Sequence, residues 1–210
     1  MAELATEGYA CNIVLLPEKH LAELAAQTSD TLAANDTLYT IDNSSVFAHL
    51  TLYMTQLDSN GIEQAEAILE GISKQIGVFT LNAQGFEQAE GYIDADYTRT
   101  AELDSLQDSV VSAINPIRSG MRAKDRARLS QTTGIAHSNL STYGYRSIGE
   151  LFRPHVSLTR FRNPPAKINT PLPVVSKFSG RFDALGLFEM GDNGTCVKEI
   201  ARFALRGSNA

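Results

Sequence analysis

Two of the four histidines in the chain stand in matching sequence frames. His49 is followed two positions later by Thr51 in the stretch FAHLTLY, and His155 is followed by Ser157 in PHVSLTRF. An imidazole titrates near neutral pH, so a pair of them suits general acid–base catalysis, and hydroxyls can donate hydrogen bonds to phosphoryl oxygens. The set fits in-line displacement at phosphorus. One neutral imidazole would activate the attacking oxygen, and the other, protonated, would supply a proton to the leaving oxygen.

Two other roles for these histidines are less favoured. A catalytic zinc commonly has three protein ligands, whereas neither histidine has a second ligand at helical or strand spacing and no carboxylate accompanies either motif. A single histidine is often a partly buried structural side chain, but two in matching frames make coincidence a poor explanation. We therefore expect no metal and no cofactor. His20 and His137 lack such a frame, and we interpret both as incidental.

Strand geometry would position these residues. Side chains alternate along a strand, so the polar residues of each motif are predicted to share one face, with the apolar residues packed under helices on the other. The predicted cleft faces are His49, Thr51 and Tyr53 in one strand and His155, Ser157, Thr159 and Phe161 in the other. Pro154 fits the first position of its strand, where a missing N–H matters least.

The remaining periodicity predicts an α+β chain. Strands are expected over 11–17, 46–54 and 154–161, within 77–88 and 91–97, and as a carboxy-terminal pair joined by a tight turn at GDNG. Helices are expected within 18–34, within 62–76 and from about residue 100 to Pro116, which ends or kinks the last one. Residues 118–148 lack clear periodicity, which is typical of a functional or mobile segment.

The charge balance limits the class of partner. A net charge of −6 argues against non-specific coating of nucleic acid, which needs a broad positive surface. It leaves room for a small phosphate ligand in a locally basic cleft. One segment has that composition, since residues 118–129 carry Arg118, Arg122, Lys124, Arg126 and Arg128 against Asp125 alone. We favour the simpler interpretation of this basic segment, a solvated helix face.

Composition and termini indicate a cytoplasmic protein without membrane attachment. No apolar run approaches the roughly 18 residues that a membrane span needs. The amino terminus MAELATEGYA has neither the basic nor the long apolar region of a signal peptide. We expect Cys11 and Cys196 to be buried thiols, because isolated cysteines of an intracellular chain seldom pair.

The two motifs resemble those of a known superfamily. HLTL at 49–52 and HVSL at 155–158 are similar to the paired His-x-Thr/Ser-x signatures of the two-histidine (2H) phosphoesterases, which include 2′-5′ RNA ligase-like proteins, cyclic nucleotide phosphodiesterases and enzymes that trim RNA ends. The strand ending in LLP and the late strands FDALGLFEMG and VKEIARFAL also resemble this superfamily, so the likeness spans most of the chain apart from 118–148. The resemblance implies an α+β fold of two pseudo-symmetric lobes, each an antiparallel-rich sheet backed by helices, around a central cleft.

The resemblance also implies a site. His49 and His155 would be the catalytic pair, and Thr51 and Ser157 the phosphate-binding hydroxyls, with serine in place of the commoner threonine in the second motif. Tyrosine can stack on a base and arginine can pair with a phosphate. Further candidate substrate contacts are therefore Tyr53, Tyr143, Tyr145, Arg146 and Arg153, although a structural role is the simpler interpretation of each one taken alone.

We therefore predict one bilobal domain over residues 1–210 that acts as a monomer. It is expected to hydrolyse a cyclic phosphate or a 2′-5′ or 3′-5′ phosphodiester of a nucleotide or short RNA, without a metal. Two alternatives stay open: reversible 2′-5′ ligation by the same residues, and a non-catalytic nucleotide- or RNA-binding module with the same cleft. The motifs do not assign base and acid between the two histidines.

Overall fold

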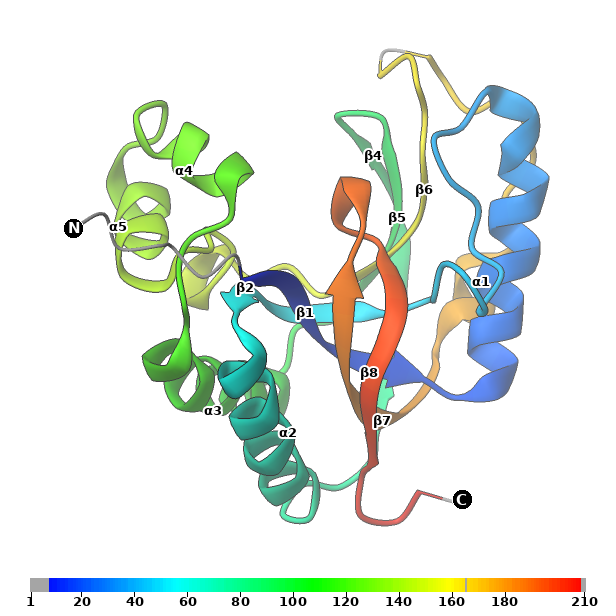
Figure 1. The fold of residues 1–210 in the computed structure, drawn as a ribbon. Helices are drawn as coiled ribbons and strands as arrows, with labels where there is room; N and C mark the ends of the chain where they lie inside the picture. Colours follow the sequence, from blue (N-terminus) through cyan, green and yellow to red (C-terminus); the bar gives the residue numbers. More distant parts are fainter. Residues whose placement is uncertain (1–7, 165, 209–210) are drawn as a thin grey trace.

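The computed structural model describes residues 8–164 and 166–208. Most of the amino-terminal stretch from which we predicted the absence of a signal peptide lies outside these residues, as do the last two positions of the predicted domain. The strands are β1 (Tyr9–Pro17), β2 (Leu50–Leu57), β3 (Phe79–Leu81), β4 (Ala83–Ala89), β5 (Tyr92–Tyr97), β6 (His155–Arg160), β7 (Gly180–Met190) and β8 (Cys196–Ala204). The α-helices are α1 (Lys19–Leu32), α2 (Ser59–Ser73), α3 (Ala101–Ile114), α4 (Ala123–Leu129) and α5 (Gly134–Tyr143) (Figure 1).

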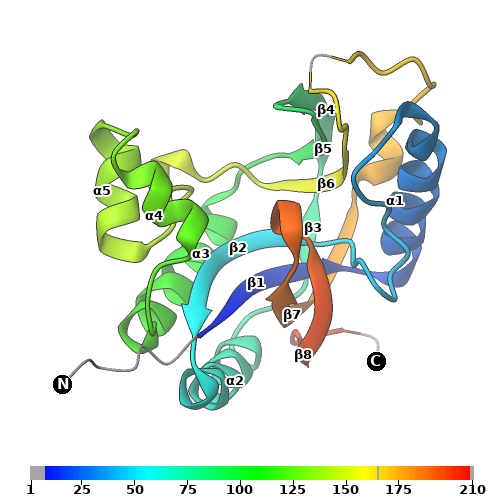
Figure 2. The same cartoon turned by 45° about the horizontal axis from the view of Figure 1, so that its top comes forward.

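One open antiparallel sheet runs through the molecule. Its strand order is β3-β7-β1-β2-β6-β5-β4, and β8 pairs with β7 outside this path. The two motif strands, β2 and β6, are neighbours at the centre, where Leu50 pairs with Val156. This narrow junction separates a half-sheet built on β1 and β2 from a half-sheet built on β5 and β6 (Figure 2). The prediction of an α+β fold with an antiparallel-rich sheet in each half is confirmed.

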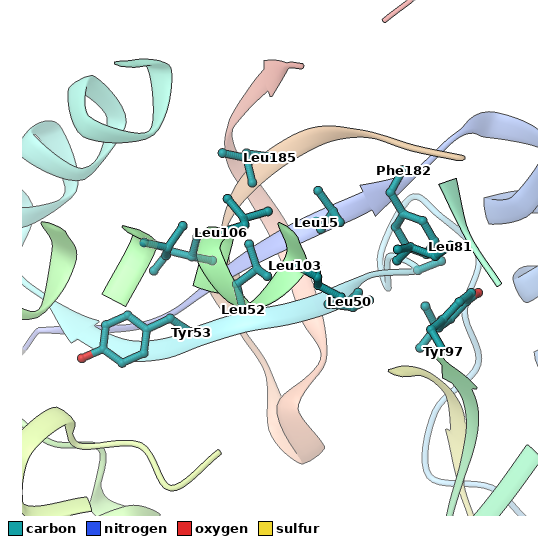
Figure 3. Packing of buried hydrophobic residues seen from close by; sticks show 14 of the residues in the cluster. Leu15, Leu50, Leu52, Tyr53, Leu81, Tyr97, Leu103, Leu106, Phe182 and Leu185 are labelled. Atoms are coloured by element: carbon teal, nitrogen blue, oxygen red, sulfur yellow. The ribbon is translucent and has the colours of Figure 1, made fainter. Parts of the chain in front are cut away.

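Each motif strand is backed by a helix. The carboxylate of Asp58 caps the amino terminus of α2, and the hydroxyl of Thr100 caps that of α3, so both helices begin where the chain leaves a strand. Helix α3 packs against β2, and α1 packs against β6. Leu50 and Leu52 of β2 belong to the same fully buried cluster as Leu103 of α3 (Figure 3). Full burial of one such leucine stabilises the fold by roughly 1.5–3 kcal/mol.

A β-bulge interrupts each motif strand at the same motif position. In β2 the register with β1 passes from Thr51 directly to Tyr53, which leaves Leu52 as the extra residue. In β6 the register with β5 passes from Ser157 to Thr159, which leaves Leu158 as the extra residue. An extra residue reverses the alternation of side chains beyond it. The bulge therefore decides which later residues face the cleft.

The bulges correct part of the predicted cleft face. Tyr53, Thr159 and Phe161 are fully buried and do not share the face of the histidines, so that part of the prediction is wrong. The hydroxyl of Tyr53 donates a hydrogen bond to the carbonyl oxygen of Tyr143 at 2.6 Å, and Asn115 Oδ1 lies 3.2 Å from it. Tyr53 is thus part of the core. Met54 follows Thr51 on the open face instead.

Two short helices occupy the segment for which the sequence showed no periodicity. Helix α4 has 7 residues, and α5 has 10 residues with apolar side chains scattered around its axis. Gly144 ends α5 in the left-handed conformation with φ 69°, which glycine adopts without strain. The segment follows α3 in the chain, and Gly120 forms a bridge with Gln56 near the carboxyl end of β2. Helices α4 and α5 lie beside one another (Figure 1).

The strand expected over 46–54 runs from Leu50 to Leu57, whereas the buried thiols and the tight turn are confirmed. Cys11 and Cys196 are free and buried, and burial raises the pKa of the Cys11 thiol to about 12. The turn between β7 and β8 contains Asn193 with φ 61°, at the GDNG sequence that predicted a tight turn. In the part of the chain that the structure describes, no helix combines the length and the apolar character needed to cross a bilayer.

Candidate active site

A cavity of about 1020 Å³ lies over the junction of the two half-sheets. Its floor carries Thr51 of β2, His155 and Ser157 of β6, and His49, which directly precedes β2. These side chains alternate with the buried Leu50 and Val156. The antiparallel register between these two residues places His49 across from Ser157 and Thr51 across from His155. The walls come from β4 and β5, from α4, and from the turn between β7 and β8. The structure thus brings both motifs into one cavity.

The two histidines are held in the same way. The carbonyl oxygen of Phe47 lies 2.8 Å from Nδ1 of His49, and that of Arg153 lies 2.7 Å from Nδ1 of His155. A carbonyl oxygen only accepts hydrogen bonds, so Nδ1 carries the proton in each neutral ring. This fixes the tautomer. Nε2 is left in both rings as the nitrogen that can accept or deliver a proton in the cavity.

The electrostatic surroundings of the two rings differ. Burial lowers the pKa of His49 to about 4, and the nearby His155 also lowers it, against the opposing effects of the Phe47 and Gly194 carbonyls. His49 is therefore neutral at pH 7. His155 has an anionic neighbour that His49 lacks, because Oδ2 of Asp94 lies 3.9 Å from Nε2 of His155. The two rings therefore differ: His49 is a neutral imidazole, and His155 lies beside a carboxylate.

The two hydroxyls also have different partners. Nδ2 of Asn12, from the neighbouring strand β1, donates a hydrogen bond to Oγ1 of Thr51 at 3.0 Å. Oγ of Ser157 donates a hydrogen bond to Oδ1 of Asp94, from the neighbouring strand β5, at 2.7 Å. Thr51 accepts in its pair, so its own proton stays available for a ligand. Ser157 uses its proton on Asp94.

Arg153 lines the cavity but is engaged by carboxylates. Its guanidinium forms ion pairs with Glu87 and Asp94 and lies 3.1 Å from Oδ1 of Asp96. Burial raises the pKa of Asp96 to about 6, although Arg153 opposes this shift. The arginine that we predicted as a phosphate contact thus holds Asp94 in place beside His155 and Ser157.

The other predicted contacts divide into two groups. Tyr145 and Arg146 line the cavity, and Arg146 is exposed there. Tyr143 is not among the lining residues, and its side chain packs partly against the core. Tyr53 lies within the core, as described above. His20 and His137 are exposed and stand away from the lining residues, in accord with their interpretation as incidental.

The basic segment contributes a wall of the cavity, which corrects its interpretation as a solvated helix face. Arg122, Lys124 and Arg128 line the cavity, whereas Arg126 of the same helix is exposed outside it. The side chain of Arg122 is only 12% exposed and pairs with the buried carboxylate of Asp125. The sequence signal for this wall was the cluster of basic residues around the single acid Asp125.

Asn12 and Asp94 were missed because the motif analysis did not extend to neighbouring strands. Their signal was a polar residue inside an apolar run, in CNIVLLP and in YIDADY. Asn12 is 0% exposed and Asp94 is 2% exposed, and a buried polar group needs a hydrogen-bond partner. In both cases a motif hydroxyl is one of the partners. Among the described residues, no group of three or more histidine, cysteine, aspartate or glutamate side chains is arranged to hold a metal ion.

Comparison with known proteins gives the family. The family described as "Protein of unknown function (DUF1045)" matches residues 59–182, more than half of the sequence, and the chain belongs to it. No curated protein matches the sequence.

Solved structures share the fold at low identity. E. coli LigT in its apo form is 14% identical, with a TM-score of 0.60 over 95% of this chain and 98% of that chain. E. coli LigT complexed with 3′-AMP is 15% identical, with a TM-score of 0.57 over 95% and 99%. TT0787 of Thermus thermophilus is 14% identical, with a TM-score of 0.58 over 95% and 99%. LigT is a 2H phosphoesterase, so the chain has the 2H phosphoesterase fold that its motifs indicated.

Proposed function

We propose that the protein is a phosphoesterase that cleaves a cyclic phosphate or a 2′-5′ or 3′-5′ phosphodiester of a nucleotide or short RNA. One observation carries the proposal. His49 and His155 are fixed at Nδ1 by equivalent backbone carbonyls and present Nε2 to one cavity, each with a motif hydroxyl two residues on. A pair of preorganised imidazoles is the arrangement that acid–base catalysis of a displacement at phosphorus requires.

The different surroundings of the two rings support a division of their roles. His49 is the general base, because its lowered pKa keeps Nε2 unprotonated at neutral pH. It takes a proton from water as the water oxygen forms its bond to phosphorus. His155 is the general acid, and the observation that favours this role is the carboxylate of Asp94, whose Oδ2 lies 3.9 Å from Nε2 of His155. It gives its Nε2 proton to the ribose oxygen as the bond from that oxygen to phosphorus breaks.

Thr51 supplies stabilisation of the charge that develops on the phosphoryl oxygens. Asn12 occupies its acceptor side, so the hydroxyl proton of Thr51 is directed to a ligand in the cavity. A nucleotide is the favoured substrate because a cavity of about 1020 Å³ is large enough for a base, a sugar and phosphates. The LigT structure complexed with 3′-AMP supports the same substrate class.

The test is a substrate panel with matched variants. The panel contains adenosine 2′,3′-cyclic phosphate, 2′-5′ and 3′-5′ linked diadenosine, and an RNA ending in a cyclic phosphate, each also incubated with a 5′-hydroxyl RNA to detect ligation. We expect wild-type turnover of at least one member and its loss in His49→Ala and His155→Ala, with His137→Ala as the control. Binding of a panel member without turnover of any would reject the proposal in favour of a binding module.

A further inference from the structure

The catalytic cavity has a cationic wall that the reaction at the two histidines does not use. The wall consists of Arg122, Lys124 and Arg128 from the segment of α4, with Arg146 from the loop after α5. One carboxylate, that of Asp125, stands among them. Another wall of the cavity is formed by β4, β5 and the turn between them, and it carries Glu87, Glu90 and Asp94. Two of these acids, Glu87 and Asp94, are paired with Arg153. The acids of that wall are thus largely paired within it, and the wall of α4 keeps an excess of positive charge.

Asp125 does not neutralise the cationic wall. It pairs closely with Arg122, and its other oxygen is 3.6 Å from Nη1 of Arg128. The ion pairs formed by the described residues leave Lys124 and Arg146 without a carboxylate partner. The pKa of Lys124 is lowered by burial and then by the charges of Arg128, Arg160 and Arg122, which outweigh Asp125. These cations repel one another, so an anion that binds between them would relieve the repulsion.

Arg122 has a separate role in this wall. It is nearly buried, with Nη1 3.0 Å from Sδ of Met54, and its guanidinium carbon lies 5.7 Å from the ring centroid of Tyr145. It is thus fixed from the floor of the cavity and anchors α4 through Asp125. The more exposed Lys124, Arg128 and Arg146 keep donors that can reach a ligand.

We infer that Lys124, Arg128 and Arg146 form a second phosphate site, which binds a terminal phosphate monoester of the same substrate molecule whose diester reacts at His49 and His155. The inference rests on the proposed function and narrows its substrate class to nucleotides with a further phosphate. A terminal monoester, nearly doubly charged at pH 7, fits several unneutralised cations better than the single charge of a backbone diester. The cavity volume, at the upper end of those of small-molecule sites, leaves room for the additional group.

A binding experiment tests the second site without turnover. Adenosine 3′-monophosphate and adenosine 3′,5′-bisphosphate are titrated calorimetrically into the full chain at low ionic strength, as wild type and as Lys124→Gln/Arg128→Gln. We expect the wild type to prefer the bisphosphate by on the order of tenfold or more, the effect of about one charge-assisted hydrogen bond. The preference should fall toward unity in the double variant and persist in Arg126→Gln, which removes the same charge from the exposed face of α4. Equal affinities in the wild type, or an undiminished preference in the double variant, would overturn the inference.

A kinetic experiment separates this inference from the proposed function. Adenosine 2′,3′-cyclic phosphate with and without a 5′-phosphate is compared by the ratio of the two kcat/KM values. We expect the ratio to favour the 5′-phosphorylated substrate in the wild type and to fall toward one in the double variant. Turnover with a ratio of one would keep the phosphoesterase and reject the second site. The opposite result is that the protein turns over neither substrate but still prefers the bisphosphate, and that the double variant loses this preference. That result would support the second phosphate site and reject the phosphoesterase activity. The kcat/KM of a dinucleotide with a 5′-hydroxyl is a further comparison. If it exceeds that of adenosine 2′,3′-cyclic phosphate by as much as the 5′-phosphorylated substrate does, this would also count against a monoester site.

Discussion

Leu50 pairs with Val156, and this antiparallel pair joins the two halves of the sheet. Because both residues face the buried side, their neighbours His49, Thr51, His155 and Ser157 face the cavity together. Neither motif could form the site alone, since each half-sheet supplies one imidazole and one hydroxyl. The pairing of two apolar residues therefore brings together two pairs of polar residues that lie far apart in the sequence.

The double replacement of the histidines tests whether they act as one unit. His49→Ala and His155→Ala should each lower the single-turnover rate by roughly 10²- to 10⁴-fold. The double variant should lose far less than the product of the two single losses, because one proton-transfer scheme needs both rings. Melting temperature and affinity for 3′-AMP are measured in parallel. Losses that simply multiply, or that follow a loss of folded protein, would indicate a structural role.

The pKa of His49 predicts the position of the acidic limb in the pH profile. The base must be unprotonated, so kcat/KM should fall as pH decreases through about 4, well below the value near 6.5 of an ordinary histidine. A proton must also be delivered to the leaving oxygen by the second imidazole, so acid–base catalysis by two imidazoles predicts a bell-shaped profile. The rate is followed from pH 3.5 to 9 at constant ionic strength, with circular dichroism to verify folding. An NMR titration, with the His49 ring assigned from His49→Gln, should show the same low value, and a midpoint near 6.5 would contradict the assignment.

The sequence predicted the motif strands better than their faces. The apolar runs of β1 and β6 and the amphipathic stripes of α1, α2 and α3 are local patterns, so they were recognised without the fold. The bulges at Leu52 and Leu158 were not, because a bulge is defined by the register with a partner strand, which alternation within one strand does not contain. Tyr53 was therefore assigned to the wrong face.

The basic wall was misjudged for a related physical reason. A short helix of 7 residues has too few turns to show a periodic pattern, and its direction in space depends on the burial of Asp125. Charge composition alone does not distinguish Arg126, which faces solvent, from Arg122, which faces the cavity. Asn12 and Asp94 likewise gained their significance only when β1 and β5 were placed beside the motif strands.

The core position of Tyr53 predicts a stability effect without a catalytic one. Tyr53→Phe removes the hydroxyl that bonds the Tyr143 carbonyl and leaves this acceptor with one partner fewer. We expect the free energy of unfolding to fall by about 1–2 kcal/mol, measured by urea denaturation. KM for the reactive panel member should not change. Tyr9→Phe, at a tyrosine that is 49% exposed, is the control and should leave stability unchanged. A raised KM in Tyr53→Phe with unaltered stability would indicate that Tyr53 contacts the substrate.

Chelation tests whether the imidazoles carry the reaction without a metal. In the proposed mechanism His49 and His155 carry both protons, and Thr51 stabilises the phosphoryl charge, so no step is assigned to a cation. Turnover should therefore persist after dialysis against EDTA and be unaffected by subsequent addition of Mg²⁺, Mn²⁺ or Zn²⁺ at equimolar amounts. Loss of the rate in EDTA, with recovery on adding one of these ions, would contradict the mechanism.

The unequal partners of the two hydroxyls predict unequal effects of removing them. Thr51 accepts from Asn12 and keeps its proton for the ligand, so Thr51→Val should lower the single-turnover rate by on the order of 10²-fold or more. Thr51→Ser retains the hydroxyl and should lose much less. Ser157 donates to Asp94, so Ser157→Ala removes a positioning contact rather than a direct donor, and its effect on the rate should be smaller than that of Thr51→Val.

Asn12→Leu should lower the single-turnover rate less than Thr51→Val does, because Thr51 keeps its hydroxyl but loses the bond that orients its proton. The four variants are compared at saturating substrate, with Ser109→Ala on the exposed face of α3 as the control. A larger loss in Ser157→Ala than in Thr51→Val would show that the hydroxyl of Ser157 turns from Asp94 to the phosphate, and would reverse the proposed division of roles.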